Sequence, residues 1–191
     1  AAGIENVMAL RGDIPAELIG ADRREWAYHY AVDLIRELKE ADPELCIGGA
    51  CYPEIHPESA NQKEDIRYLK EKVQAGCDFL TTQMFFDNKV FYDFERRCRE
   101  AGITVPIIPG LKPLSTARQV ALLPESFSID IPLELTQEIT KAGDDRKAIY
   151  NIGAEWCAMQ CKELISHGVP AVHFYTMGKT DNIVKILKQC F

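Results

Sequence analysis

The chain has 191 residues, of which 47% are hydrophobic and 27% charged, and it carries a formal net charge of −7. These values are typical of one ordinary globular domain, and the acidic balance disfavours general nucleic-acid binding, which needs a basic patch. No run approaches the roughly 18 apolar residues that a membrane span requires, and no basic region followed by an apolar core indicates a signal peptide.

Short apolar runs alternate along the chain with longer runs that have the spacing of amphipathic helices. The expected elements, in chain order, are a strand at 7–10, a helix at 24–39, a strand at 46–50, a helix at 63–74, a strand at 79–82, a helix at 90–101, a strand at 105–108, a helix at 116–123, two helices within 132–167, a strand at 171–176 and a helix at 182–190. We expect Pro124 to stop one helix, and Asp144-Asp145 to cap the helix that follows a break at Gly143.

This alternation of strands and helices predicts an α/β fold with a parallel sheet covered by helices. An open, doubly wound sheet of five strands fits the pattern. Part of a (β/α)8 barrel fits it equally well, since a complete barrel needs about 250 residues. In both architectures, ligands bind at the carboxyl ends of the strands.

The segments that follow the expected strands are polar, aromatic or rich in glycine and proline. They comprise residues 11–13, 51–58, 82–87, 109–113 and 177–179. Gln83 offers both a donor and an acceptor to a planar heterocycle, and Tyr52 could pack against a ring. Glu54 could serve as a general acid, but no feature of the sequence indicates that its pKa is raised, so we assign it no role.

Several of these residues also have plain structural interpretations. Asp13 could be a turn residue, His56 a hydrogen-bonded loop residue, and Lys72 a solvated helix residue. The cysteines are odd in number and irregularly spaced, which indicates free thiols in a reducing cytoplasm. Cys157 and Cys161 are four residues apart on an expected helix, but no further ligand completes a metal site, so buried packing is favoured.

In these segments, which would form the rim at the carboxyl ends of the strands, the chain resembles the methylenetetrahydrofolate reductases. The matching segments are residues 10–13 (Leu-Arg-Gly-Asp), 52–58 (Tyr-Pro-Glu-Ile-His-Pro-Glu), 82–87 (Thr-Gln-Met-Phe-Phe-Asp), 107–110 (Ile-Ile-Pro-Gly) and 173–176 (His-Phe-Tyr-Thr). They occur in the order of that family and at about its spacing. The resemblance implies a partial (β/α)8 TIM barrel of about five parallel strands, roughly strands four to eight. Residues 1–191 would then be a single domain, the C-terminal portion of a flavin-dependent catalytic barrel.

The resemblance also implies site residues. Asp13 resembles the catalytic aspartate beside the flavin. The residues that match FAD contacts are Arg11, Gly12, Asp13, Tyr30, Ala31, Tyr52, His56, Asp65 and Lys72. Gln83, Gln119 and Lys179 match substrate-binding positions, although the family often has an arginine at the last one. Leu123 stands where an aromatic residue is expected, and the general-acid glutamate of the family would precede Ala1, so we expect this fragment alone to be inactive.

The implied activity is the reduction of 5,10-methylenetetrahydrofolate to 5-methyltetrahydrofolate, with FAD as cofactor and NADH or NADPH as reductant, in a ping-pong reaction of cytoplasmic one-carbon metabolism and methionine biosynthesis. The implied associations are a homo-oligomer or a complex with another chain, with neither membrane nor nucleic acid. Two alternatives stay open. One is a non-catalytic half-barrel subunit or binding module. The other is a flavin-free folate- or pterin-binding barrel enzyme.

Overall fold

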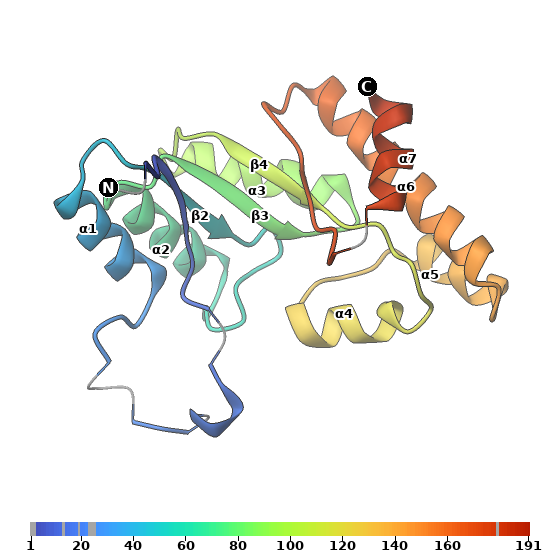
Figure 1. Ribbon diagram of the computed structural model, residues 1–191, viewed down its shortest axis with the longest axis horizontal. Coiled ribbons are helices and arrows are strands. Elements are labelled where there is room, and N and C mark those ends of the chain that lie inside the picture. The colour runs from blue at the N-terminus through green and yellow to red at the C-terminus, as the bar shows by residue number, and fades with distance from the viewer. Residues whose placement is uncertain (1–2, 13, 19, 23–25, 179) are drawn as a thin grey trace.

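The computed structural model describes residues 3–12, 14–18, 20–22, 26–178 and 180–191 (Figure 1). Within them, five strands form one parallel sheet in the order β1-β2-β3-β4-β5. The strands are β1 (Asn6–Ala9), β2 (Cys46–Cys51), β3 (Phe79–Met84), β4 (Ile107–Leu111) and β5 (His173–Phe174).

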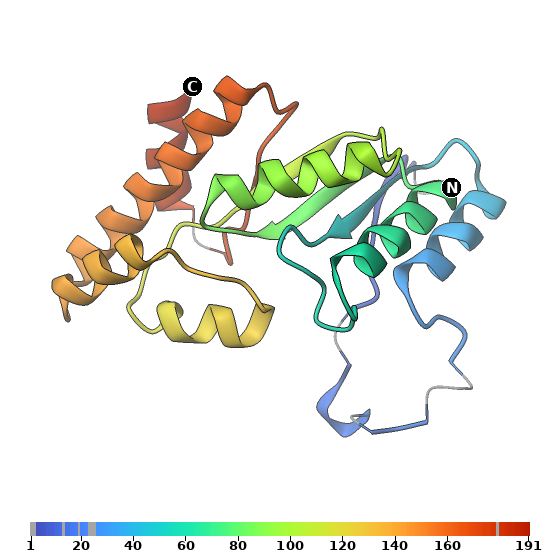
Figure 2. The same ribbon diagram turned by 180° about the vertical axis from the view of Figure 1, so that it is seen from behind.

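The connections between the strands are helical. The helices are η1 (Ala16–Leu18, a 3-10 helix), α1 (Ala31–Ala41), α2 (Gln62–Gln74), α3 (Asn88–Glu100), α4 (Gln119–Phe127), α5 (Leu133–Ala142), α6 (Arg146–His167) and α7 (Asp181–Cys190). Helices α1, α2 and α3 lie side by side on one face of the sheet (Figure 2). Helix α4 lies apart from this layer, beyond the carboxyl ends of β3 and β4 (Figure 1).

The strand order decides between the two expected architectures. A doubly wound sheet reverses its direction of growth at a switch point, where strands that are distant in sequence become neighbours. Here each strand pairs with the next one in the chain, so every crossover moves the same way and the sheet curls as in a barrel. The predicted partial barrel is therefore confirmed.

Side chains alternate between the two faces of the sheet. Ile47 and Leu80 are fully buried beneath the helices. On the opposite face, a Cβ added at Gly48 would clash with the ring of Phe79 and would lie 2.8 Å from the sulfur of Met8, so these three residues pack in one row across three strands. A second apolar cluster joins the end of β3 to the later helices and comprises Met84, Phe86, Leu114, Leu123, Ile129, Leu135, Ile139 and Ile149.

Two helix boundaries differ most from expectation. The first long helix begins at Ala31 instead of near residue 24, because the carboxylate of Asp33 accepts hydrogen bonds from the backbone N–H groups of His29 and Tyr30, both at 3.0 Å, and so caps the helix there. Pro124 does not stop α4, which continues to Phe127. Proline removes one helical hydrogen bond, but Phe127 packs against the second apolar cluster and holds the last turn.

The strands β3 and β4 extend further than expected. Gln83 and Met84 belong to β3, and β4 continues through Pro109 and Gly110 instead of ending before them. The N–H of Gly110 donates to the hydroxyl of Thr82 at 2.8 Å, so β4 stays attached to β3. A Cβ at Gly110 would lie 2.7 Å from the ring of Tyr175, which explains why glycine occupies this position.

The strand expected at 171–176 is shorter in the structure, where β5 covers His173–Phe174, and α4 begins at Gln119 instead of Thr116. The break at Gly143 is present, and Asp145 caps α6 by accepting from the N–H groups of Lys147 and Ala148 at 3.0 Å, as predicted. All seven cysteines are free thiols. In the described ranges, no helix has both the length and the apolar character needed to cross a membrane.

Gly153 is the closest contact between α6 and the loop after β4, and it provides a test of the packing. A Cβ there would lie 2.7 Å from the carbonyl carbon of Leu114. Helix propensity alone would make Gly153→Ala stabilising by about 1 kcal/mol. We expect instead a net destabilisation of at least about 2 kcal/mol in urea unfolding, because the backbone of Leu114 must shift.

The matched control is Ser166→Ala, at an exposed position on the same helix. It should change the free energy of unfolding by no more than about 0.5 kcal/mol. A stabilising Gly153→Ala substitution would show that this contact is not tight in solution.

Candidate functional site

The loop that follows β2 carries an aromatic pair. The rings of Tyr52 and His56 meet edge to face, with their centroids 4.6 Å apart. The Nδ1 atom of His56 accepts from the N–H of Glu58 at 3.1 Å, and burial lowers the pKa of His56. At pH 7 His56 is therefore a neutral ring, suited to packing against another planar group.

Arg11, just after β1, lies beside this loop. Its guanidinium group makes an ion pair with Glu58 at 2.7 Å, which raises the pKa of Arg11, and its central carbon lies 5.9 Å from the centroid of the Tyr30 ring. The predicted cofactor contacts Arg11, Tyr30, Tyr52 and His56 thus come from three segments and lie in one neighbourhood. Gly12 has a φ of 77°, a left-handed conformation that favours glycine at this turn.

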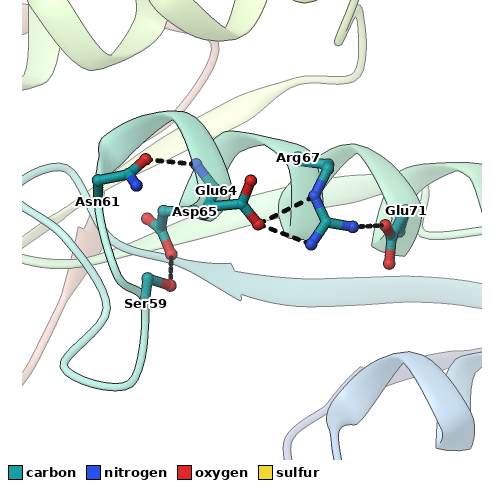
Figure 3. Close-up of polar contacts among 6 residues, drawn as sticks. All are labelled: Ser59, Asn61, Glu64, Asp65, Arg67 and Glu71. Atoms are coloured by element: carbon teal, nitrogen blue, oxygen red, sulfur yellow. Dashed lines mark hydrogen bonds and ion pairs between the residues drawn. The ribbon is translucent and has the colours of Figure 1, made fainter.

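The start of α2 is held by polar contacts (Figure 3). Asn61 caps the helix by accepting from the N–H of Glu64 at 3.0 Å, and the hydroxyl of Ser59 donates to Asp65 at 2.7 Å. Asp65, a predicted cofactor contact, is therefore tied to the loop that carries His56. Further along α2, Arg67 forms ion pairs with Glu64 and Glu71 on the exposed side.

Lys72 takes a different position from the rim residues. It is half-buried between α2 and β2, where its ammonium group donates to the carbonyl oxygen of Ala50 at 2.6 Å. Burial lowers the pKa of Lys72, while the charge of Asp65 acts in the opposite direction. Ala50 lies near the carboxyl end of β2, so the ammonium group lies just beneath the rim, where it is hydrogen-bonded to the strand.

Tyr52 and Gln83 line the same small cavity, which is too narrow to admit a water molecule. Its other lining residues are Pro53, Glu54, Ile55, Met84, Phe127, Ser128 and Ile129. The side-chain oxygen of Gln83 accepts from the N–H of Met84 at 2.9 Å. The cavity has no room for a ligand, so it marks the place where the loops after β2 and β3 meet the segment between α4 and α5.

Glu54 is the residue of this cavity whose chemistry the sequence did not reveal. One carboxylate oxygen accepts from the N–H of Asp130 at 2.9 Å, and the other is buried without a hydrogen bond to any described residue. Burial raises the pKa of Glu54 to about 7. The hydrogen bond from the N–H of Asp130 acts in the opposite direction, and the negative charge of Asp130 acts in the same direction as burial. A contact between residues 76 positions apart leaves no local signal in the sequence.

Gln119 and Leu123 do not line this cavity. The side-chain oxygen of Gln119 accepts from the N–H groups of Ser115 at 2.7 Å and Thr116 at 3.2 Å, so Gln119 folds onto the start of its own helix, away from the cavity lining. Leu123 is a core residue of the second apolar cluster, only 4% exposed. Asp13 and Lys179 lie outside the described residues. Ala31 is the first residue of α1.

No group of three or more histidine, cysteine, aspartate or glutamate side chains in the described part of the chain could hold a metal ion. The cation at the end of β4, Lys112, is 6% exposed. It makes no ion pair with a described residue, and burial alone lowers its pKa.

The fold and the site define an α/β protein of the barrel type, with aromatic, amide and cationic side chains at the carboxyl ends of its parallel strands. Residues 1–190 match the sequence model of the methylenetetrahydrofolate reductase family, and the chain belongs to that family.

Individual relatives agree with this assignment. The chain is 36% identical to "Probable methylenetetrahydrofolate reductase (NADPH)" of Caenorhabditis elegans, over 98% of the chain and 28% of that protein. It is 32% identical to "Methylenetetrahydrofolate reductase (NADH) 1" of Arabidopsis thaliana, over 97% of the chain and 33% of that protein. For the "5,10-methylenetetrahydrofolate reductase" of Escherichia coli, the identity is 37%, over 94% of the chain and 58% of that protein. The chain thus spans about a third of the eukaryotic relatives and somewhat over half of the bacterial one.

One solved structure shares the fold at a TM-score of 0.56 and 17% identity, over 83% of the chain and 57% of that protein. It is an uncharacterized protein from Clostridium thermocellum that binds two copies of 5-methyl-5,6,7,8-tetrahydrofolic acid. At this identity, the likeness supports the barrel architecture alone.

Lys112 provides a test of the electrostatics at this rim. The Lys112 side chain is mostly buried, so its ammonium group is partly desolvated, which reduces stability; methionine has a similar length without the charge. We expect Lys112→Met to raise the free energy of unfolding by about 1 kcal/mol in urea unfolding. The control is Lys89→Met, at an exposed position on α3, which should be neutral. A destabilised Lys112→Met variant would show that the ammonium group has a partner in solution.

Proposed function

We propose that the chain carries part of the FAD site and part of the folate site of a methylenetetrahydrofolate reductase, which reduces 5,10-methylenetetrahydrofolate to 5-methyltetrahydrofolate with NADH or NADPH. Membership of the family supports the reaction, and the names of the relatives include both reductants. The observation that carries the proposal is the shared cavity of Tyr52, which matches a cofactor contact, and Gln83, which matches a folate contact.

The residues beside this cavity suit FAD. Its two phosphates require positive charge, and the guanidinium group of Arg11 lies at the rim, where phosphates would compete with Glu58 for it. Its ring systems require flat apolar partners, which Tyr30, Tyr52 and the neutral His56 provide. FAD, when bound, supplies the hydride chemistry, and the protein supplies binding and orientation.

The chain's own residues would then hold the flavin and the folate in position. Tyr52 and His56 hold a ring by contact, and Gln83, whose oxygen is engaged by the backbone of Met84, keeps its amide N–H groups for a carbonyl or ring nitrogen of the folate. Asp13, Gln119 and Lys179 are assigned to the site by resemblance, with Asp13 beside the flavin. We place the enzyme in the cytoplasm and in the one-carbon metabolism that serves methionine synthesis. A homo-oligomer or another chain would cover the edge strands β1 and β5.

The first test is FAD binding by the full-length protein, followed by the quenching of flavin fluorescence. Loss of the aromatic contact in Tyr52→Ala should weaken FAD binding about tenfold. The matched control is Tyr68→Ala, which removes an exposed tyrosine of α2 that stacks on Arg67, and it should bind FAD normally. Folate binding without flavin binding would favour the flavin-free enzyme, and capture of a protein partner independently of FAD would favour the binding module.

The second test concerns Asp13. In the full-length protein, Asp13→Asn should retain FAD but alter the rate of folate reduction, because the substitution removes a negative charge beside the flavin while keeping the side chain's size. The two half-reactions are measured separately by stopped-flow absorbance. Unchanged rates in both half-reactions would count against the role of Asp13.

A further inference from the structure

Glu54 connects two parts of the molecule that are distant in sequence. It lies in the loop after β2, two residues beyond Tyr52, and its carboxylate accepts from the backbone N–H of Asp130 in the segment between α4 and α5 at 2.9 Å. That segment also contributes Ser128 and Ile129 to the wall of the cavity that Gln83 lines. The hydrogen bond therefore ties one wall of the cavity to the opposite rim loop.

The surroundings of this carboxyl group are unusual for a glutamate. Its second oxygen is fully buried and has no hydrogen-bond partner among the described residues. Facing it, the segment between α4 and α5 brings the charge of Asp130, and β3 brings the neutral Gln83. The rim loop adds the phenol of Tyr52, and Arg97 of α3 donates to the carbonyl of Pro53 at 3.3 Å.

We propose that Glu54 is a positioning residue for the folate site: its carboxyl group ties the Ser128–Asp130 segment to the β2 loop and thereby holds that segment in place beside Gln83. The identity of the ligand as a folate rests on the function proposed above. The tie itself rests only on the contacts of Glu54.

The tie depends on pH in a direction that the burial determines. The closed arrangement holds the proton of Glu54 more tightly than an open, solvated one, since burial outweighs the opposing effect of the hydrogen bond from Asp130 and raises the pKa from the ordinary value of 4.5 to about 7. The tie is therefore strongest below pH 4.5, weakens as the pH rises toward 7, and is weakest above that value. Removing the charge of Asp130 would narrow the pH range over which the tie weakens, because that charge contributes to the raised pKa of Glu54.

Hydrogen–deuterium exchange at the amide of Asp130 in the full-length protein tests the tie directly. After correction for intrinsic exchange rates, we expect protection in the wild type to fall about tenfold between about pH 6 and pH 8. Glu54→Gln keeps a carbonyl acceptor without a charge, so protection should persist and be independent of pH. Glu54→Ala should lose it at both pH values, and the control Glu125→Gln, an exposed residue of α4, should behave like the wild type.

Titration with 5-methyltetrahydrofolate, measured by isothermal calorimetry on the same variants, tests the positioning role. Glu54→Ala should weaken binding about tenfold, whereas Glu54→Gln should bind like the wild type near pH 6 and more tightly near pH 8. The tie would be overturned if amide exchange at Asp130 in Glu54→Gln kept the pH dependence of the wild type. It would also be overturned if that amide stayed fully protected in Glu54→Ala. Unchanged folate affinity in Glu54→Ala would overturn the positioning role. A wild type with the expected exchange but no folate binding would instead refute the proposed function and leave the tie in place.

Discussion

Each strand of the sheet pairs in parallel with the next strand in the chain, from β1 to β5, and the location of the site follows from this pairing. Parallel strands send all their carboxyl ends to one edge, so the loops after them share a rim although more than a hundred residues separate the first from the last. Arg11 after β1 and Glu58 after β2 meet for this reason. The same geometry places Tyr52 and Gln83 on one cavity.

Close packing at three glycines holds this arrangement together. Gly48 leaves room for the ring of Phe79, Gly110 brings β4 close to β3 and Tyr175, and Gly153 lets α6 approach the loop after β4. A side chain at any of these positions would separate elements that the rim needs close together. The second apolar cluster then holds α4 and the segment after it beside the end of β3.

The polar groups of the rim differ in how many hydrogen bonds and ion pairs they make. Arg11 is paired with Glu58, and Lys72 is engaged by the backbone of β2. Glu54 and Lys112 carry titratable groups that are partly removed from water and have few partners, and burial shifts the pKa of each in the direction that favours its neutral form. Shifts of this kind concentrate at functional sites, and here both groups lie at the rim at which the loops meet.

Much of the architecture followed from the sequence. Periodic apolar residues located the strands and most helices, and the glycine and aspartate between α5 and α6 marked a true boundary. The pattern could not decide between an open sheet and a barrel, because both use the same local alternation and differ only in which strands pair. The resemblance in the rim segments supplied that decision in advance, and the strand order confirmed it.

What only the tertiary structure decided are the contacts between distant residues. The continuation of α4 past Pro124 depends on packing with the second apolar cluster, and the extension of β4 depends on the bond from Gly110 to Thr82. The raised pKa of Glu54 has the same origin, since burial is a property of the packed chain and of no local segment. The sequence by itself determined which types of side chain follow the strands and so stand at the rim. Only the fold decided which of these side chains are buried away from water and which contact one another.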